Sequence, residues 1–284
     1  MSDVVYRNMV RILKLVISMG FYVGCRIRSW SRRIMSEKLP GTCVVLYYHA
    51  VTSKQRSKFA HQMDDLIRWA KPVRADTMNP LERGVHHAVV TFDDGFQSVV
   101  ENALPELIQR KIPSTVFIPT GYLGRHAEWD SELEYQDCHE KIMTVDQLRK
   151  LSSDLVSIGS HTVMHRRLPL LGEEEAKREL VESRQELESI LGCDTKLFSF
   201  PYGEYNQVLL EWCRQAGYER VFTILPILAF SEPEEYVTGR IRVTPTDWRL
   251  EFRLKLLGAY CWLPLSFALK RKMRLIVGKS TLPR

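Results

Sequence analysis

The chain has 284 residues, 45% of them hydrophobic and 26% charged, and its 40 basic residues against 34 acidic ones give a net charge of +6. This composition excludes a disordered or fibrous protein, and the length allows one α/β domain of barrel size or two small domains. The basic excess gathers near the two ends beside apolar runs, and no nucleic-acid reader motif occurs. We therefore expect a membrane surface, and no nucleic acid, as the partner of this charge.

The six cysteines lie apart along the chain and form no CxxC pair. This dispersion disfavours a disulfide framework and a thiolate zinc site. We expect free thiols in a reducing compartment, and hence a protein that is peripheral on the cytoplasmic face of the cell membrane. An uncleaved anchor that exports the chain to the outer face is the alternative.

Residues 9–25 are mostly apolar but are interrupted by Arg11 and Lys14. The uninterrupted part, 15–25, is shorter than the ~20 residues that a membrane span needs, and no small-residue cleavage site follows a long apolar segment. The pattern favours an interfacial helix whose flanking arginines lie near lipid phosphates. A helix packed on the domain is the alternative.

Residues 256–269 are again apolar, contain Pro264, and are followed directly by the basic run 270–272. A short, proline-broken and basic-flanked segment suits the membrane interface better than the hydrocarbon centre. We therefore expect three parts: an N-terminal apolar and basic membrane-associating segment at 1–40, a catalytic domain at 41–248, and a C-terminal apolar and basic segment at 249–284.

Between the ends, short apolar runs alternate with helical patterns. The expected strands are 43–48, 88–92, 114–118, 155–158, 197–200, 220–224 and 239–243, and the expected helices are 59–69, 98–110, 144–152, 173–191 and 207–216. Such an alternation predicts a parallel sheet with helices outside it. The expected fold class is α/β, an incomplete (β/α) barrel of about seven parallel strands. A flat doubly wound sheet is the alternative, and no GxGxxG motif supports it.

The run 88–92 ends in two adjacent carboxylates, Asp93 and Asp94, and then turns at Gly95. Unbroken apolar runs are typical of parallel strands buried on both faces, and function in such folds lies at the carboxyl ends of the strands. Two neighbouring carboxylates repel each other, so ionising both is unfavourable unless a cation is present. The stretch therefore predicts a metal site to which other segments contribute.

The next expected strand, 155–158, is followed by His161 and His165. Two histidines four residues apart can project from one helical turn toward one ion. Two histidines and one aspartate form a hydrolytic metal set with room for water, and the second aspartate is then free to act as a base. Histidines at this spacing that only pack or lie at the surface are the alternative.

A sharp turn at Pro201-Tyr202-Gly203 follows the expected strand 197–200. A backbone N–H of this turn could face the site and donate to an oxyanion. An ordinary strand-to-helix turn is the alternative.

The motifs TFDDG (91–95), HTVMH (161–165) and FPYG (200–203) together resemble those of the polysaccharide deacetylases, carbohydrate esterase family four. Their order and spacing match, and the resemblance covers about residues 44–243. It implies an incomplete (β/α) barrel, and it implies that Asp93 is the general base and that the backbone N–H of Tyr202 donates to the oxyanion. It also implies a ligand set for a divalent metal: Asp94, His161 and His165.

The chain departs from the family pattern at two places. Ser199 stands where many members have an arginine that orients the base, and no histidine follows His165 to supply the late-motif general acid. A subgroup that resembles the deacetylases of poly-N-acetylglucosamine export has Tyr-His at its first strand, as this chain does at residues 48–49. We hypothesise that His49 is the general acid and that Arg240 supplies the orienting charge. The alternative for His49 is a structural histidine at a strand end.

The resemblance implies a metal-dependent hydrolase that removes an acetyl group from an N-acetylated sugar, an N-acetylhexosamine. Zinc suits the nitrogen and oxygen ligands best, and cobalt, nickel or manganese would also fit them. The basic and apolar ends favour a lipid-linked saccharide or a surface polysaccharide as substrate. An O-acetyl carbohydrate esterase and a catalytically weak, membrane-associated saccharide-binding protein are the alternatives.

Overall fold

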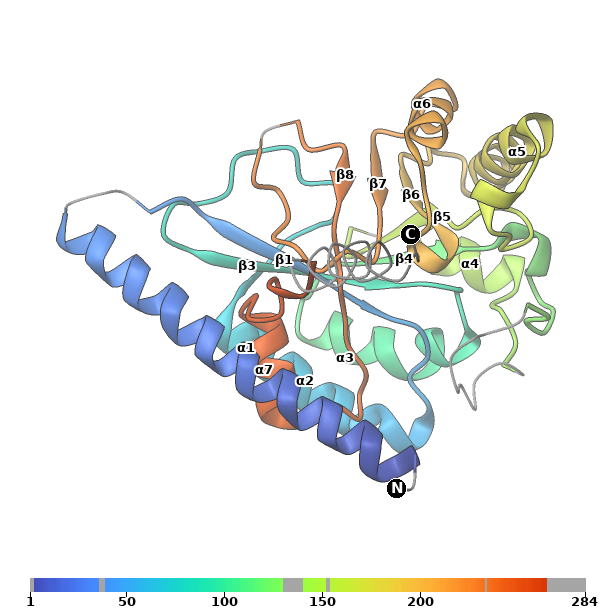
Figure 1. The fold of residues 1–284 in the computed structure, drawn as a ribbon. Helices are drawn as coiled ribbons and strands as arrows, with labels where there is room; N and C mark the ends of the chain where they lie inside the picture. Colours follow the sequence, from blue (N-terminus) through green and yellow to red (C-terminus); the bar gives the residue numbers. More distant parts are fainter. Residues whose placement is uncertain (1–2, 36–38, 130–139, 152–153, 233, 265–284) are drawn as a thin grey trace, which may run out of the picture.

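The computed structural model describes residues 3–35, 39–129, 140–151, 154–232 and 234–264. Strands and helices alternate along the chain, with the strands in one curled sheet and the helices outside it (Figure 1). The strands are β1 (Thr42–Tyr48), β2 (Lys71–Pro72), β3 (His86–Phe92), β4 (Ser114–Ile118), β5 (Val156–Ser160), β6 (Leu197–Ser199), β7 (Arg220–Phe222), β8 (Val237–Thr238) and β9 (Ile241–Arg242). The α-helices are α1 (Asp3–Ile34), α2 (Arg56–Trp69), α3 (Leu104–Gln109), α4 (Val145–Leu151), α5 (Glu173–Leu191), α6 (Gln207–Gln215) and α7 (Arg249–Leu256).

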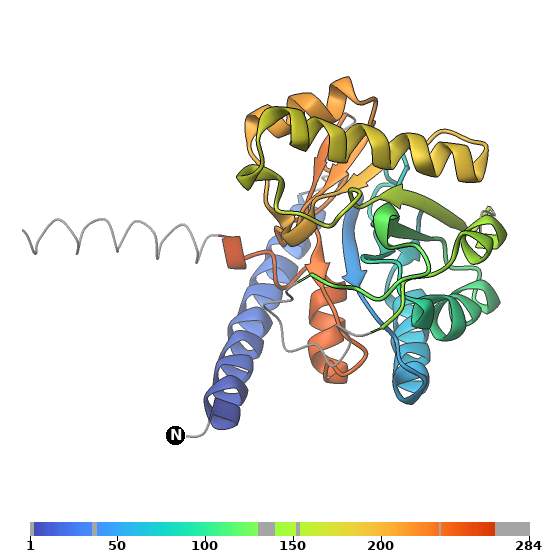
Figure 2. The same ribbon diagram turned by 90° about the vertical axis from the view of Figure 1, so that its right-hand side faces the viewer.

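The sheet is parallel throughout and follows the order β8-β7-β6-β5-β4-β3-β1-β9, with β2 paired to β3 off this path. Eight strands on one curled path form an incomplete barrel, which confirms the predicted fold class. The helices α5 and α6 lie on one side of the sheet and α2 and α3 on the opposite side (Figures 1 and 2). The sequence pattern missed β2 and β8, because two-residue strands carry no alternation to detect.

The two edges of the sheet meet at Gly239 and Arg240. These residues separate β8, which pairs with β7, from β9, which pairs with β1. Three Cα steps from Thr238 to Ile241 span on the order of 10 Å at most, so the sheet has to curl until its edges nearly touch. A Cβ on Gly239 would lie 2.3 Å from the Leu225 carbonyl oxygen, so this close approach needs glycine. This junction of the two sheet edges therefore places Arg240 at the inner side of the barrel.

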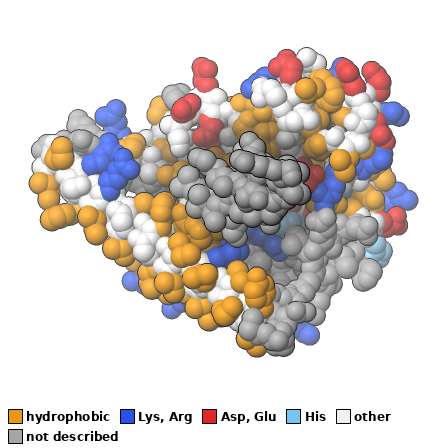
Figure 3. Space-filling view, viewed as in Figure 1, with side chains coloured by type: hydrophobic (Ala, Val, Ile, Leu, Met, Phe, Trp, Pro, Cys, Tyr) orange, Lys and Arg blue, Asp and Glu red, His pale blue; other side chains and the backbone are white. Residues whose placement is uncertain are grey.

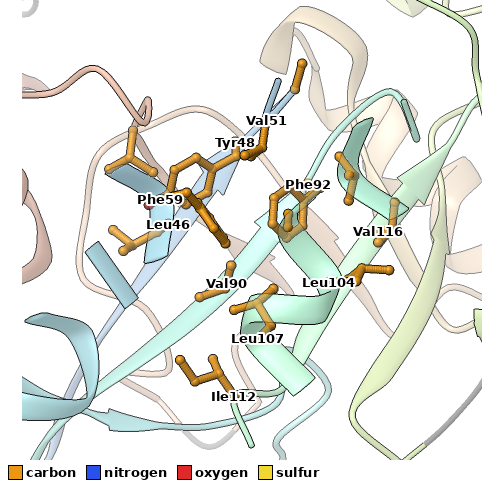
Figure 4. Packing of buried hydrophobic residues seen from close by; sticks show 14 of the residues in the cluster. Leu46, Tyr48, Val51, Phe59, Val90, Phe92, Leu104, Leu107, Ile112 and Val116 are labelled. Atoms are coloured by element: carbon orange, nitrogen blue, oxygen red, sulfur yellow. The ribbon is translucent and has the colours of Figure 1, made fainter. Parts of the chain in front are cut away.

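The strand residues alternate between the two faces of the sheet. Outward-facing apolar residues of β1, β3 and β4 pack against α2 and α3 in the main core (Figure 4). Inward-facing residues fill the barrel: Cys43, Val45, Val89, Phe117, Leu197 and Phe222. Asp93 lies two residues after Thr91, whose side chain faces inward from β3. The alternation of side chains along the strand therefore directs the Asp93 carboxylate into the barrel.

Two helix ends show how local sequence sets the structure. The backbone N–H of Thr144 donates to Gln147 Oε1 at 2.8 Å and the N–H of Gln147 donates to Thr144 Oγ1 at 3.2 Å, which forms a capping box at the start of α4. The long helix α5 ends at Gly192, whose φ of 69° is the left-handed conformation that favours glycine at a helix end.

The terminal segments are more closely tied to the domain than the sequence indicated. The N-terminal helix runs from Asp3 to Ile34 as one unit and packs on α7. Phe252, Leu256 and Tyr260 of the predicted C-terminal segment are buried in the main core. Its remainder, 265–284, lies outside the described residues. The boundaries 1–40, 41–248 and 249–284 and the membrane placement of both ends stay predictions.

Asp65 joins α2 to α7. Its carboxylate accepts hydrogen bonds from Arg253 Nη2 at 2.7 Å and from Arg249 Nε at 3.1 Å. Burial works to raise the pKa of Asp65, but the hydrogen bonds from the two arginines outweigh it and hold the pKa below its ordinary value. The ion pair therefore stabilises the fold at any pH at which the carboxylate of the unfolded chain is ionised.

We expect Asp65→Asn to lower the free energy of unfolding by about 1–3 kcal/mol at pH 7, because two arginines lose a charged acceptor. The folded pKa lies below the unfolded value of about 3.9. The difference in unfolding free energy between the wild type and the variant should thus be complete above that value and should shrink as the pH falls through the folded pKa. Urea unfolding of both proteins at pH 7 and at acidic pH measures it. A difference in unfolding free energy that stays constant as the pH falls would contradict this assignment.

Candidate active site

Asp93 and Asp94 lie at the carboxyl end of β3, where the chain turns sharply. The N–H of Asp93 donates to the Tyr48 carbonyl oxygen at 2.9 Å, which continues the pairing of β3 with β1 by one residue. Asp94 and Gly95 then both adopt positive φ, 68° and 62°. The reversal turns the side chain of Asp94 toward the loop after β5 while that of Asp93 points into the barrel. A non-glycine residue in this conformation is strained, and such strain clusters at functional sites.

Asp94, His161 and His165 come together as a possible metal-binding triad. All three are buried, and their ligand atoms lie within 4.8 Å of one another. The Asp94 Oδ1 atom is 3.5 Å from His161 Nε2 and 3.3 Å from His165 Nε2. Tetrahedral coordination with bonds of about 2.1 Å places neighbouring ligands about 3.4 Å apart. The spacing therefore fits one ion at a common point.

Hydrogen bonding prepares this triad for a cation. His161 Nδ1 lies 2.7 Å from the Ser199 carbonyl oxygen, which can only accept, so Nδ1 carries the proton and Nε2 offers a lone pair toward Asp94. Among the described residues, the buried atoms Asp94 Oδ1 and His165 Nδ1 have no hydrogen-bond partner. Burial works to raise the pKa of Asp94, but the two imidazoles hold it well below its ordinary value. An ionised, unsatisfied carboxylate oxygen facing two imidazole nitrogens is an oxygen and nitrogen set that suits zinc.

The segment 161–165 is a loop, so the expectation that both histidines project from one helical turn is wrong. Thr162 and His165 have φ of 69° and 50°, outside the helical region. The N–H groups of Val163 and Met164 both donate to Glu179 Oε2 of α5 at 2.8 Å. A carboxylate that holds two successive amides favours this curled backbone over a helix, in which the amides would turn toward carbonyl groups of the preceding turn.

Glu179 is thus a supporting residue of the loop that carries His161 and His165, and sequence analysis missed it. A glutamate within the charged helix 173–191 carries no signal that sets it apart from its solvated neighbours. Replacing it with methionine should leave both loop amides without their acceptor and lower the zinc affinity about 10–100-fold, as for other groups that orient metal ligands. Isothermal titration with zinc measures this. Glu179→Gln is the matched control, since its carbonyl oxygen keeps an acceptor, and equal affinities for both variants would contradict this role.

Asp93 is paired with Arg240, which is fully buried. Arg240 Nη1 lies 2.7 Å from Asp93 Oδ1 and Nη2 lies 2.7 Å from Oδ2, a bidentate ion pair. Arg240 Nη2 also donates to Ser199 Oγ at 2.7 Å, and Nε donates to the Thr223 carbonyl oxygen at 3.2 Å. Burial works to raise the pKa of Asp93, and the charge of Arg240 holds it below its ordinary value. The small side chain of Ser199 leaves the room that Arg240 occupies.

His49 and Tyr202 lie at the same mouth of the barrel. The half-buried ring of His49 is 5.7 Å from the ring of Tyr47. Burial lowers the pKa of His49 below its ordinary value, although the charges of Asp94 and Asp93 work to raise it. Tyr202 has a φ of 58°, and its ring meets that of His165 edge-on at 5.0 Å.

Aromatic side chains pack beside His165 of the possible metal-binding triad. The ring of Trp129 stacks on His165 at 4.2 Å with an interplanar angle of 22°, and Tyr122 contacts Trp129 edge-on at 4.9 Å. Trp129 belongs to the long polar insertion after β4, of which residues 130–139 lie outside the described part. Flat aromatic faces beside a polar centre suit the apolar faces of a sugar ring.

The structure therefore gathers all seven predicted site residues at one end of the barrel: His49, Asp93, Asp94, His161, His165, Tyr202 and Arg240. Their individual catalytic roles stay predictions.

Comparison with known proteins agrees with this arrangement. Residues 82–221 match the family model described as polysaccharide deacetylase, so the chain carries a domain of the polysaccharide deacetylase family. The YxkH protein of Bacillus subtilis, which is named as a polysaccharide deacetylase, is 23% identical over an alignment that covers 76% of this chain and 75% of YxkH.

Two solved structures have the same fold. IcaB from Ammonifex degensii superposes with a TM-score of 0.63 and 28% identity, over 78% of this chain and 100% of IcaB. The deacetylase PplD of Streptococcus pyogenes, solved in complex with acetate, superposes with a TM-score of 0.60 and 20% identity, over 73% of this chain and 95% of PplD. The resemblance to PplD concerns the fold alone.

Proposed function

We propose that this chain is a metal-dependent N-deacetylase of an N-acetylated saccharide, an N-acetylhexosamine in a lipid-linked saccharide or a surface polysaccharide. The observation that carries the proposal is the pairing of two carboxylates in different surroundings. Asp93 is held by an arginine inside the barrel, whereas Asp94, one residue on, faces two imidazoles. A base and a metal ligand side by side are what hydrolysis of an unactivated amide requires. The family model and the named relatives support the same reaction.

The residues of the triad fit a divalent cation, with zinc as first choice and cobalt, nickel or manganese as alternatives. When bound, such an ion supplies Lewis-acid polarisation of the acetyl carbonyl group and lowers the pKa of a coordinated water.

Different residues of the chain would accept the proton of the attacking water, orient the base and stabilise the oxyanion. Asp93 would accept a proton from the attacking water. Its Oδ1 atom accepts hydrogen bonds from both Arg240 and Ser199 Oγ, whereas Oδ2 keeps a second lone pair beside the one that Arg240 occupies. Arg240 fixes the direction of that carboxylate. The backbone N–H of Tyr202 would donate a hydrogen bond to the oxyanion.

His49 would protonate the departing sugar nitrogen, so that water and the amide become acetate and a free amine. Because its pKa lies below the ordinary value, His49 is neutral near neutral pH. During the reaction it would gain the proton that the attacking water gives up to Asp93, and it would pass this proton to the sugar nitrogen.

The products test the proposal. The purified, zinc-loaded protein should release acetate from an N-acetylglucosamine oligomer and leave one new primary amine for each acetate. An O-acetyl esterase would release acetate from an O-acetylated sugar with no new amine, and a saccharide-binding protein would release none. Acetate without amine, or binding without acetate, would overturn the N-deacetylase assignment.

A further inference from the structure

The helix α1 carries a continuous apolar face that no other described part of the chain covers. Large apolar side chains recur along it every three or four residues, which places them on one side of the helix. Each is at least 44% exposed: Val5, Met9, Ile12, Val16, Met19, Val23, Ile27, Trp30 and Ile34. Figure 3 shows hydrophobic side chains along the length of α1. At 32 residues the helix is about 48 Å long, so this face far exceeds the isolated apolar residues that are normal on a protein surface.

A different side of α1 holds it to the domain. Arg11 pairs with Glu251 of α7, with Arg11 Nε 2.7 Å from Glu251 Oε2. The buried Ser18 Oγ accepts a hydrogen bond from Trp262 Nε1 at 2.9 Å, and Leu15 and Tyr22 pack against the main core. These residues also recur every three or four positions, but on another line of the helix. The apolar outer face, defined here as the nine side chains named above, is therefore not the face that α1 needs to fold.

The charges of α1 indicate what covers this outer face. The helix contains seven basic residues and a single acidic one, Asp3. Lys14, Arg26 and Arg28 are exposed. At about 100° per residue, Arg26 lies next to the apolar stripe, whereas Lys14 and Arg28 lie on sides of the helix away from it. A second copy of the chain would bring the same positive excess against it, whereas an anionic lipid surface neutralises that excess and buries the apolar side chains in one step. In the described part of the chain, no helix has the length and the low charge needed to cross a bilayer.

We propose that the outer face of α1 docks on an anionic membrane surface. The helix lies parallel to the bilayer, with its apolar stripe among the acyl chains and Arg26 at the phosphate groups. The positive charge of the other basic side chains attracts the helix to the anionic surface. This docking surface does not depend on the reaction that the barrel catalyses.

A groove lies between α1 and residues of the barrel that neighbour the candidate active site. A cavity of about 650 Å³ lies between the N-terminal half of α1 and the barrel, and Lys14, Ile224 and Arg242 are among its lining residues. Ile224 lies against Gly203, which belongs to the tight turn beside Tyr202. A Cβ built on Gly203 would lie 2.3 Å from the Cγ1 atom of Ile224. Arg242 pairs in register with Tyr47 at the end of β1. A saccharide held at the bilayer would thus reach the barrel mouth along this groove, a consequence that rests on the proposed function.

Vesicle sedimentation of the full chain tests the docking. The wild-type protein should sediment with vesicles of phosphatidylcholine and phosphatidylglycerol, and less with phosphatidylcholine alone or at high salt, since salt screens the basic side chains. The test variant carries Ile12→Gln, Val16→Gln and Val23→Gln, which keep good helix formers at three outer positions. Its partition coefficient should fall about tenfold or more, because three inserted side chains lose their burial.

The matched control carries Ile108→Gln, Val181→Gln and Val208→Gln, on α3, α5 and α6. These side chains are also exposed, by 49%, 37% and 53%, against 49%, 56% and 49% for the three on α1. The control should sediment like the wild type. Circular dichroism should show that all three proteins are folded.

Equal sedimentation of the α1 variant and the wild type would overturn the proposal, as would a wild type that binds no vesicle. Concentration-dependent dimerisation lost in the α1 variant, without vesicle binding, would identify a second copy as the occupant and would also overturn it. Acetate release from a soluble oligosaccharide should be the same for the α1 variant and the wild type. A failure of the deacetylase assignment would appear in that assay and not in sedimentation.

Discussion

Replacing Asp93 with asparagine should lower kcat for deacetylation by about 10²–10⁴-fold, the range lost when a positioned general base is removed. The amide keeps the shape of the carboxylate and can still accept a hydrogen bond from Arg240, but it cannot take a proton from water. The triad of Asp94, His161 and His165 is untouched, so the zinc content of the variant should match that of the wild type. Acetate release and metal analysis on the same preparation measure both quantities.

Asp65→Asn is the matched control for this variant. Asp65 is also a buried aspartate paired with arginines, but it joins α2 to α7 on the outside of the barrel. It should lose stability and keep kcat. A comparable loss of kcat in both variants, or near-normal turnover with Asp93→Asn, would contradict the role of Asp93 as base.

Replacing Arg240 with methionine should lower both stability and turnover. It leaves the carboxylate of Asp93 buried without its counter-charge, and breaking a buried ion pair in this way costs about 3–5 kcal/mol of unfolding free energy. The carboxylate also loses two 2.7 Å hydrogen bonds that fix its direction. We therefore expect kcat to fall at least about 10²-fold. Urea unfolding and steady-state kinetics, run below the new unfolding midpoint, measure the two effects.

Arg220→Met separates the catalytic part of this effect from the structural part. Arg220 is as deeply buried as Arg240, but its Nη1 donates to the carbonyl oxygens of Ala75 and Thr77, at 2.7 and 2.9 Å, and not to a site residue. Its loss should destabilise the fold and leave kcat of the folded fraction close to that of the wild type. If Arg240→Met behaved in the same way, Arg240 would be a structural residue only.

The parts of the site that follow strand ends could be predicted from the sequence. Asp93 and Asp94 follow the run 88–92, and His161 follows the run 155–158 after two intervening residues. In a parallel sheet the carboxyl ends of the strands meet at one edge. The strand period also directs Asp93 into the barrel. Only the resemblance, from which Ser199 departs, predicts a role for Arg240. Its pairing with Asp93 depends on the closeness of the two sheet edges, which no local pattern encodes.

Other features depend on long-range contacts and left no sequence signal. The loop at 161–165 is held away from a helix by Glu179, a residue of another element whose pattern resembles that of its solvated neighbours. The burial of Phe252 and Tyr260 makes this part of the apolar and basic C-terminal segment contribute to the core. A single run of apolar and basic residues does not show which of its sides faces a domain, and only the contacts of Arg11 and Ser18 distinguish the two faces of α1.

The proposed reaction depends on one divalent ion held by Asp94, His161 and His165. Metal removal and restoration test this dependence: the protein is treated with a chelator, the chelator is removed, and zinc is titrated back while acetate release from an N-acetylglucosamine oligomer is recorded. We expect no acetate from the metal-free protein, recovery that saturates at one equivalent of zinc, and no recovery in His165→Ala. Full activity of the metal-free protein, or unchanged zinc binding by His165→Ala, would contradict the account.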